Sequence, residues 1–491
     1  MKKATHGCMR MMAALTAFAG VAVSLAGAPE FKIGTVGNPT AIHIQRTMKA
    51  LEESTAEKPA TVRVLFYGQS IVRQGWTDVL MKMLREKYPT VNFVYENRAI
   101  GGFTSPALSR TAWSDLYPYY PDLLFFHVYG PIDKYEEIVK NTRAMTSAEI
   151  VLWSSHLSKG QDPKKMLAER DKRTKDIMAV AERNKCMFVD LNRKWSEMLV
   201  ANGWAATNLL ADGIHMNAKT DAFKYYAGFI GEEMCRIPGT SGESEVSGTI
   251  TELPAVEGPS VKVAEDGAIT LSFSGNRVVA VSSGANFNLG SGAAQAEADL
   301  FLDGRPVSSY KEMWYCSRVS TLVSWMPMLY RVTFNEPPVK EKWTLTYIDG
   351  TDQWGDPVHY KVEGSVTGFD GEGWSTNAFA SASGRAVIAK DAYHFKWQYD
   401  YFVKKNVEKR PELMKKAAKP GDKITWQTLP LFADPFEAKK AGERSVLVQN
   451  CSNGRHVLEI RPKSKGGKLP GIEKFIIYSP APSAVKAPHV D

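Results

Sequence analysis

From Thr61 to Met234 the sequence alternates short runs of β-branched and aromatic residues with longer amphipathic stretches. This alternation is typical of βαβ units, in which helices join parallel strands and cover the sheet. We expect strands at Val62–Tyr67, Asn92–Glu96, Leu123–Val128, Ile150–Trp153 and Met187–Leu191. Helical stretches lie between them, at Trp76–Tyr88, Tyr135–Met145 and Pro163–Asn184. The pattern predicts one three-layer α/β domain, which we place at residues 61–237.

After Ile237 the pattern changes. Residues 238–244 read Pro-Gly-Thr-Ser-Gly-Glu-Ser, which is typical of a linker, and long helical periodicity nearly disappears. Short alternating runs follow, such as Ala268–Ser272, Arg277–Val281, Asp299–Leu302, Trp343–Ile348 and Val446–Val448. Turn signals separate many of them, among them Asp303-Gly304, Asp349-Gly350 and Asn453-Gly454. We therefore expect an all-β sandwich at 245–483, with a polar, helix-bearing insertion near 404–423.

The N-terminus has the features of a secretory signal peptide. A basic start precedes an apolar run and the small residues Ala26-Gly27-Ala28. We assign residues 1–28 to it, with cleavage after Ala26 as an alternative, and treat 29–60 as a lead-in segment. The apolar run is shorter than the roughly 20 residues that span a bilayer. We therefore expect a secreted or periplasmic protein without stable membrane insertion, and an uncleaved anchor is the alternative.

The net charge and the cysteine content exclude few further classes of protein or partner. The formal charge of +8 is weak and scattered over 491 residues, so it does not favour a nucleic-acid partner. Export would leave Cys186, Cys235, Cys316 and Cys451, which allow three disulfide pairings. A chain of this size does not require disulfides, and Cys186 opens an expected buried strand, so we interpret it as a core thiol.

Two short motifs carry the residues of a nucleophilic site. Gly68-Gln69-Ser70 directly follows the first strand and precedes a helix, at the edge where open α/β sheets bind ligands. On its own Ser70 is more simply interpreted as a helix N-cap. Asp212 and His215 lie on one loop before the last helix of the domain. A serine hydroxyl needs a neutral imidazole to take its proton and a carboxylate to orient that imidazole, so the combination suggests a triad.

Three blocks in this order, Gly-x-Ser at 68–70, Asn97-x-x-x-x-Gly102 and Asp212-x-x-His215, resemble those of SGNH (GDSL-like) hydrolases. The resemblance covers about residues 61–236 and implies a flavodoxin-like parallel sheet. It implies that Ser70 is the nucleophile, that His215 is the general base and then acid, and that Asp212 is its partner. The backbone N–H groups of Ser70 and Gly102 would form part of the oxyanion hole.

Two departures from the family pattern bear on activity and substrate. Gln69 replaces the usual aspartate, and the resulting Gly-Gln-Ser is similar to that of sialate O-acetylesterase and acetylxylan esterase relatives. The asparagine expected after strand three is absent from residues 127–133, so one oxyanion donor is missing. Loss of one such donor lowers the rate on the order of a hundred- to a thousandfold. The candidates for lining the pocket are Gln69, Asn97, Arg98, His127, Tyr129 and His156. Each of the last three is more simply a packed residue, and Arg98 could be a substrate clamp or a surface charge.

The β-rich half contains seven of the twelve tryptophans, namely Trp314, Trp325, Trp343, Trp354, Trp374, Trp397 and Trp426. Most tryptophans in a sandwich belong to its core, so we expect two or three at most to be exposed platforms that stack on sugars. Tyr393 and Trp397, in the densest aromatic cluster, are the preferred glycan-binding candidates. The acidic segment 349–352 could hold Ca²⁺ but is better interpreted as a hairpin turn, so no metal is expected.

These observations predict a secreted serine esterase that removes acetyl or similar acyl groups from a polysaccharide or oligosaccharide through an acyl-enzyme. The mechanism requires no metal and no organic cofactor. One alternative is a non-hydrolytic glycan-binding protein on a degenerate scaffold. Others are a lipid-ester hydrolase, disfavoured by the absence of a long apolar lid segment, and a glycan-cleaving enzyme that uses Asp212 or another carboxylate.

Overall fold

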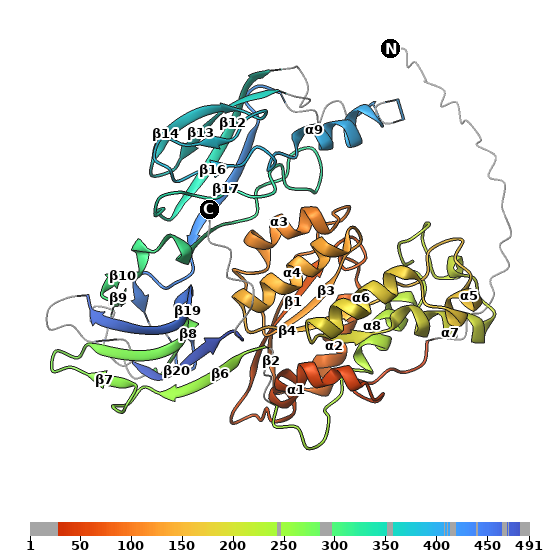
Figure 1. The fold of residues 1–491 in the computed structure, drawn as a ribbon, viewed down its shortest axis with the longest axis horizontal. Helices are drawn as coiled ribbons and strands as arrows, with labels where there is room; N and C mark the ends of the chain where they lie inside the picture. The colour runs from red at the N-terminus through yellow and green to blue at the C-terminus, as the bar shows by residue number, and fades with distance from the viewer. Residues whose placement is uncertain are drawn as a thin grey trace, which may run out of the picture.

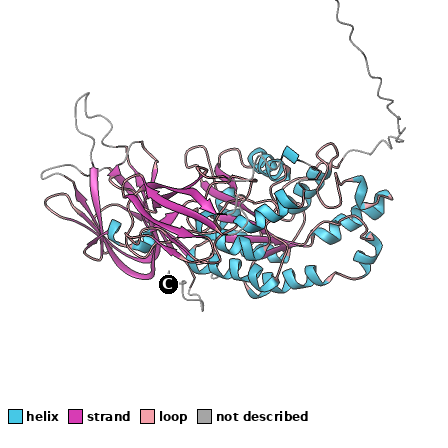
Figure 2. Cartoon of the chain, turned by 90° about the horizontal axis from the view of Figure 1, so that it is seen from above, coloured by secondary structure: helices cyan, strands magenta, loops and turns pink. Residues whose placement is uncertain are grey.

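The computed structural model describes residues 28–242, 247–284, 297–350, 357–406, 408–409, 411–412, 419–437, 440–463, 469 and 471–481. They form an N-terminal α/β unit and a C-terminal β-rich unit that pack side by side (Figure 1). Viewed from above, the helices lie mostly at one end of the molecule and the strands of the sandwich at the other (Figure 2).

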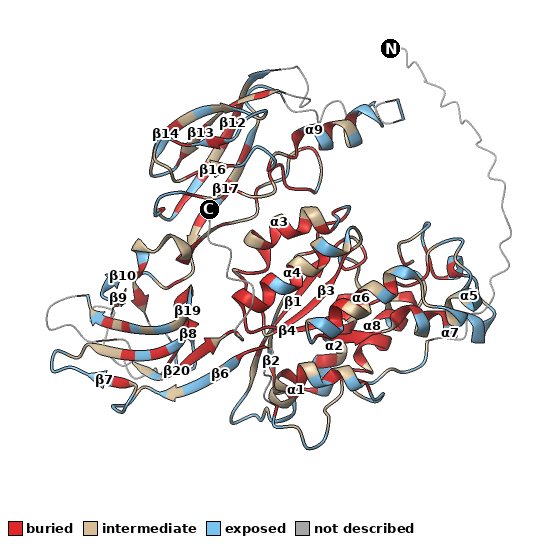
Figure 3. Ribbon diagram, in the orientation of Figure 1, coloured by how far each residue is buried: buried red, intermediate tan, exposed pale blue. Residues whose placement is uncertain are grey.

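Five parallel strands form the central sheet of the α/β unit. They are β1 (Thr61–Gly68), β2 (Asn92–Asn97), β3 (Leu123–His127), β4 (Glu149–Trp153) and β5 (Met187–Val189). The strand order is β2-β1-β3-β4-β5, the flavodoxin-like order, so the predicted fold class is confirmed. β3, β4 and β5 are buried throughout, which explains why they read as continuous apolar runs (Figure 3).

Helices cover both faces of this sheet, and apolar clusters fill the space on either side of it. They are η1 (Pro39–Ile44), α1 (Gln45–Glu52), α2 (Trp76–Lys87), α3 (Ser105–Asp115), α4 (Ile132–Met145), α5 (Pro163–Ala168), α6 (Lys172–Arg183), α7 (Leu191–Asn202), η2 (Ala206–Asn208) and α8 (Ala222–Gly231). The expected continuous helix at Pro163–Asn184 is wrong. The chain breaks before Asp171, whose side chain accepts from the Thr174 N–H and so caps a new helix.

The lead-in segment belongs to the α/β unit. The amide of Asn38 donates to the carbonyl oxygen of Phe188 at 2.9 Å, and η1 and α1 pack their apolar side chains into the core beneath the sheet. The expected signal peptide falls on residues 1–27, which lie outside the described ranges, so it stays a prediction. None of the helices in the described ranges combines the length and apolarity of a bilayer-spanning segment.

The β-rich unit is a sandwich, as predicted. One sheet has the order β10-β9-β19-β8-β20-β6 and the other β11-β17-β12-β13-β14, and side chains of both contribute to one apolar core. The elements are β6 (Thr249–Pro254), β7 (Val261–Val263), β8 (Ile269–Ser282), β9 (Glu297–Leu302), β10 (Arg305–Pro306), η3 (Val307–Ser309), η4 (Lys311–Met313), β11 (Trp314–Cys316), β12 (Glu341–Gly350), β13 (Val358–Gly364), β14 (Gly368–Trp374), β15 (Phe379–Ala380), β16 (Val387–Ile388), α9 (Phe395–Gln398), η5 (Tyr399–Lys404), β17 (Lys423–Pro430), β18 (Phe436–Glu437), β19 (Arg444–Pro462) and β20 (Ile472–Ser479).

Several local predictions in this unit differ from the structure. The two runs expected around residue 275 are one strand, β8, and Asn453-Gly454 is not a hairpin turn but lies inside its partner β19. A bulge between Gln449 and Gly454 absorbs the extra residues, and Asn450 takes a left-handed conformation with φ 73°. Asp303-Gly304 does connect a two-residue hairpin. Asp349-Gly350 ends β12, while residues 351–356 lie outside the described part of the chain.

Two further sequence expectations concern residues of this unit. Part of the expected insertion near 404–423, residues 407, 410 and 413–418, lies outside the described residues. The described residues just before it are helical, in α9 and η5. All four cysteines downstream of the expected leader are free thiols, so no disulfide joins the two units.

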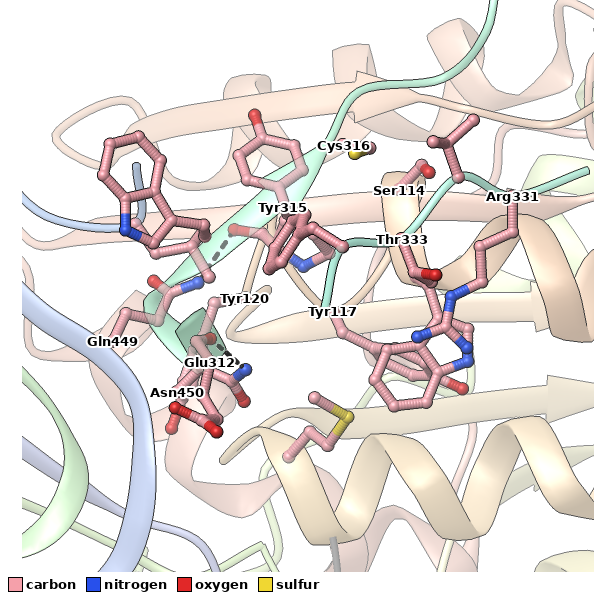
Figure 4. A pocket seen from close by; sticks show the side chains of 17 residues that line it. Ser114, Tyr117, Tyr120, Glu312, Tyr315, Cys316, Arg331, Thr333, Gln449 and Asn450 are labelled. Carbon is pink, nitrogen blue, oxygen red and sulfur yellow. Dashed lines mark hydrogen bonds between the residues drawn. The ribbon is translucent and has the colours of Figure 1, made fainter. Parts of the chain in front are cut away.

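Buried polar contacts join the two units. Arg318 donates to both carboxylate oxygens of Asp115, at the end of α3, and to the carbonyl oxygen of Arg98. The hydroxyl of Tyr120 donates to Asn276 of β8 at 2.8 Å. A cavity at this junction is lined by residues of both units, among them the ring of Tyr117 and the guanidinium of Arg331 (Figure 4). The β-rich unit therefore packs against the side of the α/β unit on which α3 lies.

Candidate active site

Ser70 lies just beyond the carboxyl end of β1, in the turn that leads into α2. The turn requires glycine at position 68, because an added Cβ there would lie 2.1 Å from the carbonyl oxygen of His127. Gln69 is buried, and its Oε1 accepts from the N–H of Ile71 at 2.7 Å and lies 3.1 Å from Ser70 Oγ. Gln69 thus holds the turn from inside and does not line an open pocket.

Asp212 and His215 lie on the loop between η2 and α8. Asp212 Oδ1 accepts from the N–H groups of Ile214 and His215, both at 2.8 Å, and Oδ2 lies 2.8 Å from His215 Nδ1. These hydrogen bonds, first those from the backbone of His215 and Ile214, lower the pKa of Asp212 to about 2. The carboxylate is therefore ionised at neutral pH, although it is largely exposed.

The imidazole of His215 joins the two motifs. Its Nδ1–H donates to the Asp212 carboxylate, which can only accept, so Nε2 carries a lone pair. Ser70 Oγ lies 2.8 Å from this Nε2 and donates to it. Ser70, His215 and Asp212 form one hydrogen-bonded chain. In this arrangement the imidazole can take the hydroxyl proton while the carboxylate stabilises the resulting cation.

Gln74 holds the two loops in register, and the sequence reasoning missed it. Its amide donates to the carbonyl oxygen of Met216 at 2.9 Å and accepts from the Met216 N–H at 3.2 Å. Met216 follows His215 directly, so this pair of hydrogen bonds fixes the distance between the imidazole and the serine turn. In the sequence, only its position four residues after Ser70 pointed to this role. Nothing in its local sequence distinguishes Gln74 from any polar residue that flanks a helix.

Two backbone N–H groups next to Ser70 are free to bind an anion. Among the described residues, neither the N–H of Ser70 nor that of Gly102 donates a hydrogen bond. Gly102 takes a left-handed conformation with φ 81°, which favours glycine. Both groups belong to turns that follow neighbouring strands, β1 and β2. They match the pair expected for an oxyanion hole, and that role is a proposal.

Two histidines expected near the pocket lie in the packed interior. His127 is fully buried, with Nδ1 donating to the carbonyl oxygen of Trp153 and Nε2 accepting from the Ser155 hydroxyl. His156 Nε2 donates to the carbonyl oxygen of Ile214 at 2.7 Å, which supports the loop of His215 from beneath. Burial lowers the pKa of His127 to about 3 and that of His156 to about 4, so both are neutral. Their role is structural, and the pocket-lining interpretation is corrected for both.

The remaining candidates in the α/β unit also have partners. The side chain of Tyr129 is largely buried beside His127, with ring centroids 5.5 Å apart. Asn97 donates to the carbonyl oxygen of Val72, and so braces the turn that carries Ser70. Arg98 pairs with Glu96 at 2.7 Å and donates to the carbonyl oxygen of Asp115. Its carbonyl oxygen also accepts from Arg318 of the β-rich unit, so Arg98 belongs to the contact between the units and is not a free clamp.

An aromatic surface from the β-rich unit lies beside the serine turn. Trp325 Nε1 donates to the carbonyl oxygen of Gly101 at 2.8 Å, and its ring contacts Phe402 edge-on. Trp397 stacks on Tyr401 with ring centroids 5.0 Å apart, and both contact Phe402. Trp325, Trp397 and Tyr401 are each 43–50% exposed. We call Trp325, Trp397, Tyr401 and Phe402 the aromatic surface.

The other aromatic candidates lie elsewhere. The hydroxyl of Tyr393 is hydrogen-bonded to that of Tyr360, and its ring packs on the sandwich core, so it is not an exposed platform. Trp314, Trp343 and Trp426 are buried, Trp374 is exposed on β14, and Trp354 lies outside the described residues. The sequence alone gave no reason to place Trp325 next to Ser70. Among the described residues no group of histidine, cysteine or carboxylate side chains is arranged to hold a metal.

Comparisons with known proteins are limited to solved structures, because no family model and no curated protein matches the chain. A two-domain esterase (CEX) active on acetylated mannans is similar at 11% identity, with 89% of this chain and 95% of that chain covered and a TM-score of 0.34. The acetylxylan esterase Axe2 from Geobacillus stearothermophilus is similar at 19% identity, over 38% of this chain and 97% of its own, with a TM-score of 0.31. A putative GDSL-like lipase from Parabacteroides merdae is 15% identical, over 36% and 97%, with a TM-score of 0.30.

Proposed function

We propose that this protein is a serine esterase that removes acetyl or similar acyl groups from a carbohydrate. The observation that carries the proposal is the hydrogen-bonded chain from Ser70 through His215 to Asp212, with distances of 2.8 Å at both links. Two motifs 145 residues apart meet at the sheet edge where open α/β sheets bind ligands. A purely structural N-cap serine would need no imidazole partner of this kind.

The mechanism follows from the hydrogen bonds. His215 Nε2 takes the hydroxyl proton as Ser70 Oγ attacks the acyl carbon, and the tetrahedral oxyanion is held by the N–H groups of Ser70 and Gly102. The imidazolium then donates its proton to the departing sugar oxygen. Water repeats the sequence on the acyl-enzyme, with His215 as base, and releases the carboxylic acid. Asp212 keeps the imidazole in the correct tautomer throughout.

The aromatic surface supports a sugar as the substrate. The half-exposed indole of Trp325 lies beside the glycine loop next to Ser70, and aromatic rings bind the apolar faces of pyranose rings. The ring of Trp397 stacks on both His394 and Tyr401, so a glycan would contact the exposed ring edges of Trp397 and Tyr401 and reach the serine across Trp325. Export, the expectation drawn from residues 1–28, is compatible with an extracellular glycan and remains part of the proposal.

A non-hydrolytic glycan-binding protein is the second candidate, favoured by one observation. The asparagine that would supply a third oxyanion donor is absent after β3, where His127 is packed into the interior and Tyr129 is half-buried beside it. Turnover would be reduced by on the order of a hundred- to a thousandfold if nothing replaces that donor.

Hydrolysis of acetylated oligosaccharides by the wild type and by Ser70→Ala separates the two candidates. The esterase predicts acetate release that falls by at least roughly 10⁴-fold in Ser70→Ala, while binding of the deacetylated glycan is retained. The binding protein predicts equal binding by both variants and no acetate release. A parallel screen with long-chain lipid esters tests the lipid-ester alternative, and the appearance of shortened oligosaccharides would indicate glycan cleavage.

A further inference from the structure

One tryptophan of the β-rich unit is bonded directly to the loop that carries a proposed oxyanion donor. Trp325 lies between β11 and β12, 224 residues from Gly101, and its indole N–H donates to the Gly101 carbonyl oxygen at 2.8 Å. That carbonyl oxygen and the N–H of Gly102 belong to the same peptide group. In a trans peptide the two point in opposite directions, so a partner that fixes the carbonyl oxygen also fixes the direction of the N–H.

The hydrogen bond acts on the strength of the donor as well as on its direction. A carbonyl that accepts a hydrogen bond polarises its own peptide, which makes the N–H at the other end a stronger donor. The Gly101 carbonyl oxygen receives this bond from the other structural unit and not from the α/β unit itself. The electrostatic quality of the proposed oxyanion site therefore depends on the packing of the two units.

Steric contacts restrain the same loop. A Cβ added to Gly101 would lie 3.2 Å from Trp325 Nε1 and 3.6 Å from Ser70 Cβ, so the indole, the peptide and the nucleophile are neighbours. A Cβ on Gly102 would lie 2.4 Å from Met326 Cε. Met326 is buried in the same apolar cluster as Ile100 and Phe103, on either side of the glycine pair.

The segment that presents Trp325 is itself held in place. The Ser324 hydroxyl donates to Gln398 Oε1 at 2.7 Å and accepts from the Met326 N–H at 3.1 Å. Gln398 is fully buried, and its amide nitrogen donates to the carbonyl oxygen of Pro327 at 2.9 Å. Trp325 therefore projects from a segment fixed by side-chain hydrogen bonds on both sides, although half of its own surface is exposed.

We propose that Trp325 is a positioning residue for catalysis, which orients and polarises the Gly101–Gly102 peptide from the β-rich unit. This inference rests on the proposed function. The β-rich unit then completes the oxyanion site, in addition to presenting the aromatic surface to a glycan. Trp325 acts through Gly102 and need not touch the acyl group.

Trp325→Phe tests the proposal, because phenylalanine keeps an aromatic ring and removes the N–H. The substrate is p-nitrophenyl acetate, which has no sugar to stack on the aromatic surface. We expect kcat to fall roughly tenfold, a fraction of the hundred- to thousandfold that loss of a whole oxyanion donor costs, with KM changed less than twofold. Binding of a boronic acid, which forms a tetrahedral adduct with the serine, should weaken by the same factor as kcat/KM.

Trp374→Phe is the matched control, since Trp374 is an exposed tryptophan on β14 that stacks on His359 and belongs to neither the triad nor the aromatic surface. It should match the wild type in both assays. Thermal unfolding of each variant checks the fold. Trp325→Leu, which has no hydrogen-bond donor, provides a second measurement should Trp325→Phe be unstable.

Wild-type kcat on p-nitrophenyl acetate in a folded Trp325→Phe or Trp325→Leu protein would overturn the inference. So would an effect confined to the KM for oligosaccharides, which would mean that Trp325 only stacks on the glycan. Failure of the proposed function is distinguishable from both results, because it would appear as an absence of Ser70-dependent hydrolysis in the wild type itself.

Discussion

Replacing Arg318 by methionine should destabilise the protein by about 3–5 kcal/mol, the usual cost of leaving one charge of a buried pair without its partner. The carboxylate of Asp115 is 3% exposed and accepts from Arg318 Nε at 2.9 Å and from Nη2 at 2.8 Å. Burial raises the pKa of Asp115, and the guanidinium opposes that shift. Methionine keeps an unbranched side chain of about the length of the arginine stem and removes the charged guanidinium.

The sign of the pH dependence follows from the same contacts. Without Arg318 the pKa of Asp115 rises further above its unfolded value, so the folded state binds more protons than the unfolded state. The stability of Arg318→Met should therefore fall as the pH rises, and the deficit should be smaller at pH 5 than at pH 8. Adding Asp115→Asn should recover part of the loss, because it removes the unpaired charge.

Urea denaturation at pH 5 and pH 8, followed by tryptophan fluorescence, measures these differences. Arg193→Met is the matched control, because the pair of Arg193 and Glu197 has a similar length of 2.9 Å but both side chains are more than half exposed. It should change the free energy of unfolding by less than about 1 kcal/mol. Equal losses of stability in the two arginine variants would refute the reasoning that burial makes the Arg318–Asp115 pair more stabilising than the exposed pair.

Three further predictions concern the site and its surroundings. Asp212→Asn should lower kcat by roughly 10⁴-fold with little change in KM, since an amide at this position favours the wrong imidazole tautomer. Steady-state kinetics measure this, and a loss of kcat of less than about tenfold would contradict it. The buried imidazoles of His127 and His156, with pKa values lowered to about 3 and about 4, stay neutral when folded but protonate when unfolded below about pH 6.5. Stability should therefore fall with decreasing pH between 6.5 and 4, by up to about 1.4 kcal/mol per pH unit for each histidine, and a pH-independent free energy of unfolding would rule this out. Trp397→Ala should raise the KM for an acetylated oligosaccharide roughly threefold to tenfold through loss of ring stacking, and an unchanged KM would remove Trp397 from the substrate site.

The α/β fold was predictable because its signals are local. Strands buried on both faces must be apolar along their whole length, so β3 and β4 are visible in the sequence as uninterrupted runs. The Ser70 and His215 motifs were also recognisable, because each lies at the end of an element whose boundary the sequence defines. One error has a local cause, since the side chain of Asp171 accepts from the Thr174 N–H and so starts a new helix in the middle of an apparently continuous one.

The contribution of the β-rich unit to the site could not be predicted in the same way. Trp325 lies 255 residues beyond Ser70 in the sequence, and nothing in its local sequence indicates that it meets Gly101. The contact depends on how two units pack, which is set by side chains such as Arg318 and Asp115 that are also far apart in sequence. The position of His127 was not predictable for a related reason, since a polar residue at a strand end can equally face solvent or, as here, hydrogen-bond to the neighbouring strand.

Labelling with a fluorophosphonate probe tests the central claim most directly, because only an activated serine hydroxyl reacts with it. Mass spectrometry of the digested protein should find the phosphonyl adduct on Ser70, and both Ser70→Ala and His215→Ala should abolish it. A wild-type protein that stays unlabelled, or one labelled at a different serine, would contradict the claim that Ser70, His215 and Asp212 form a working triad.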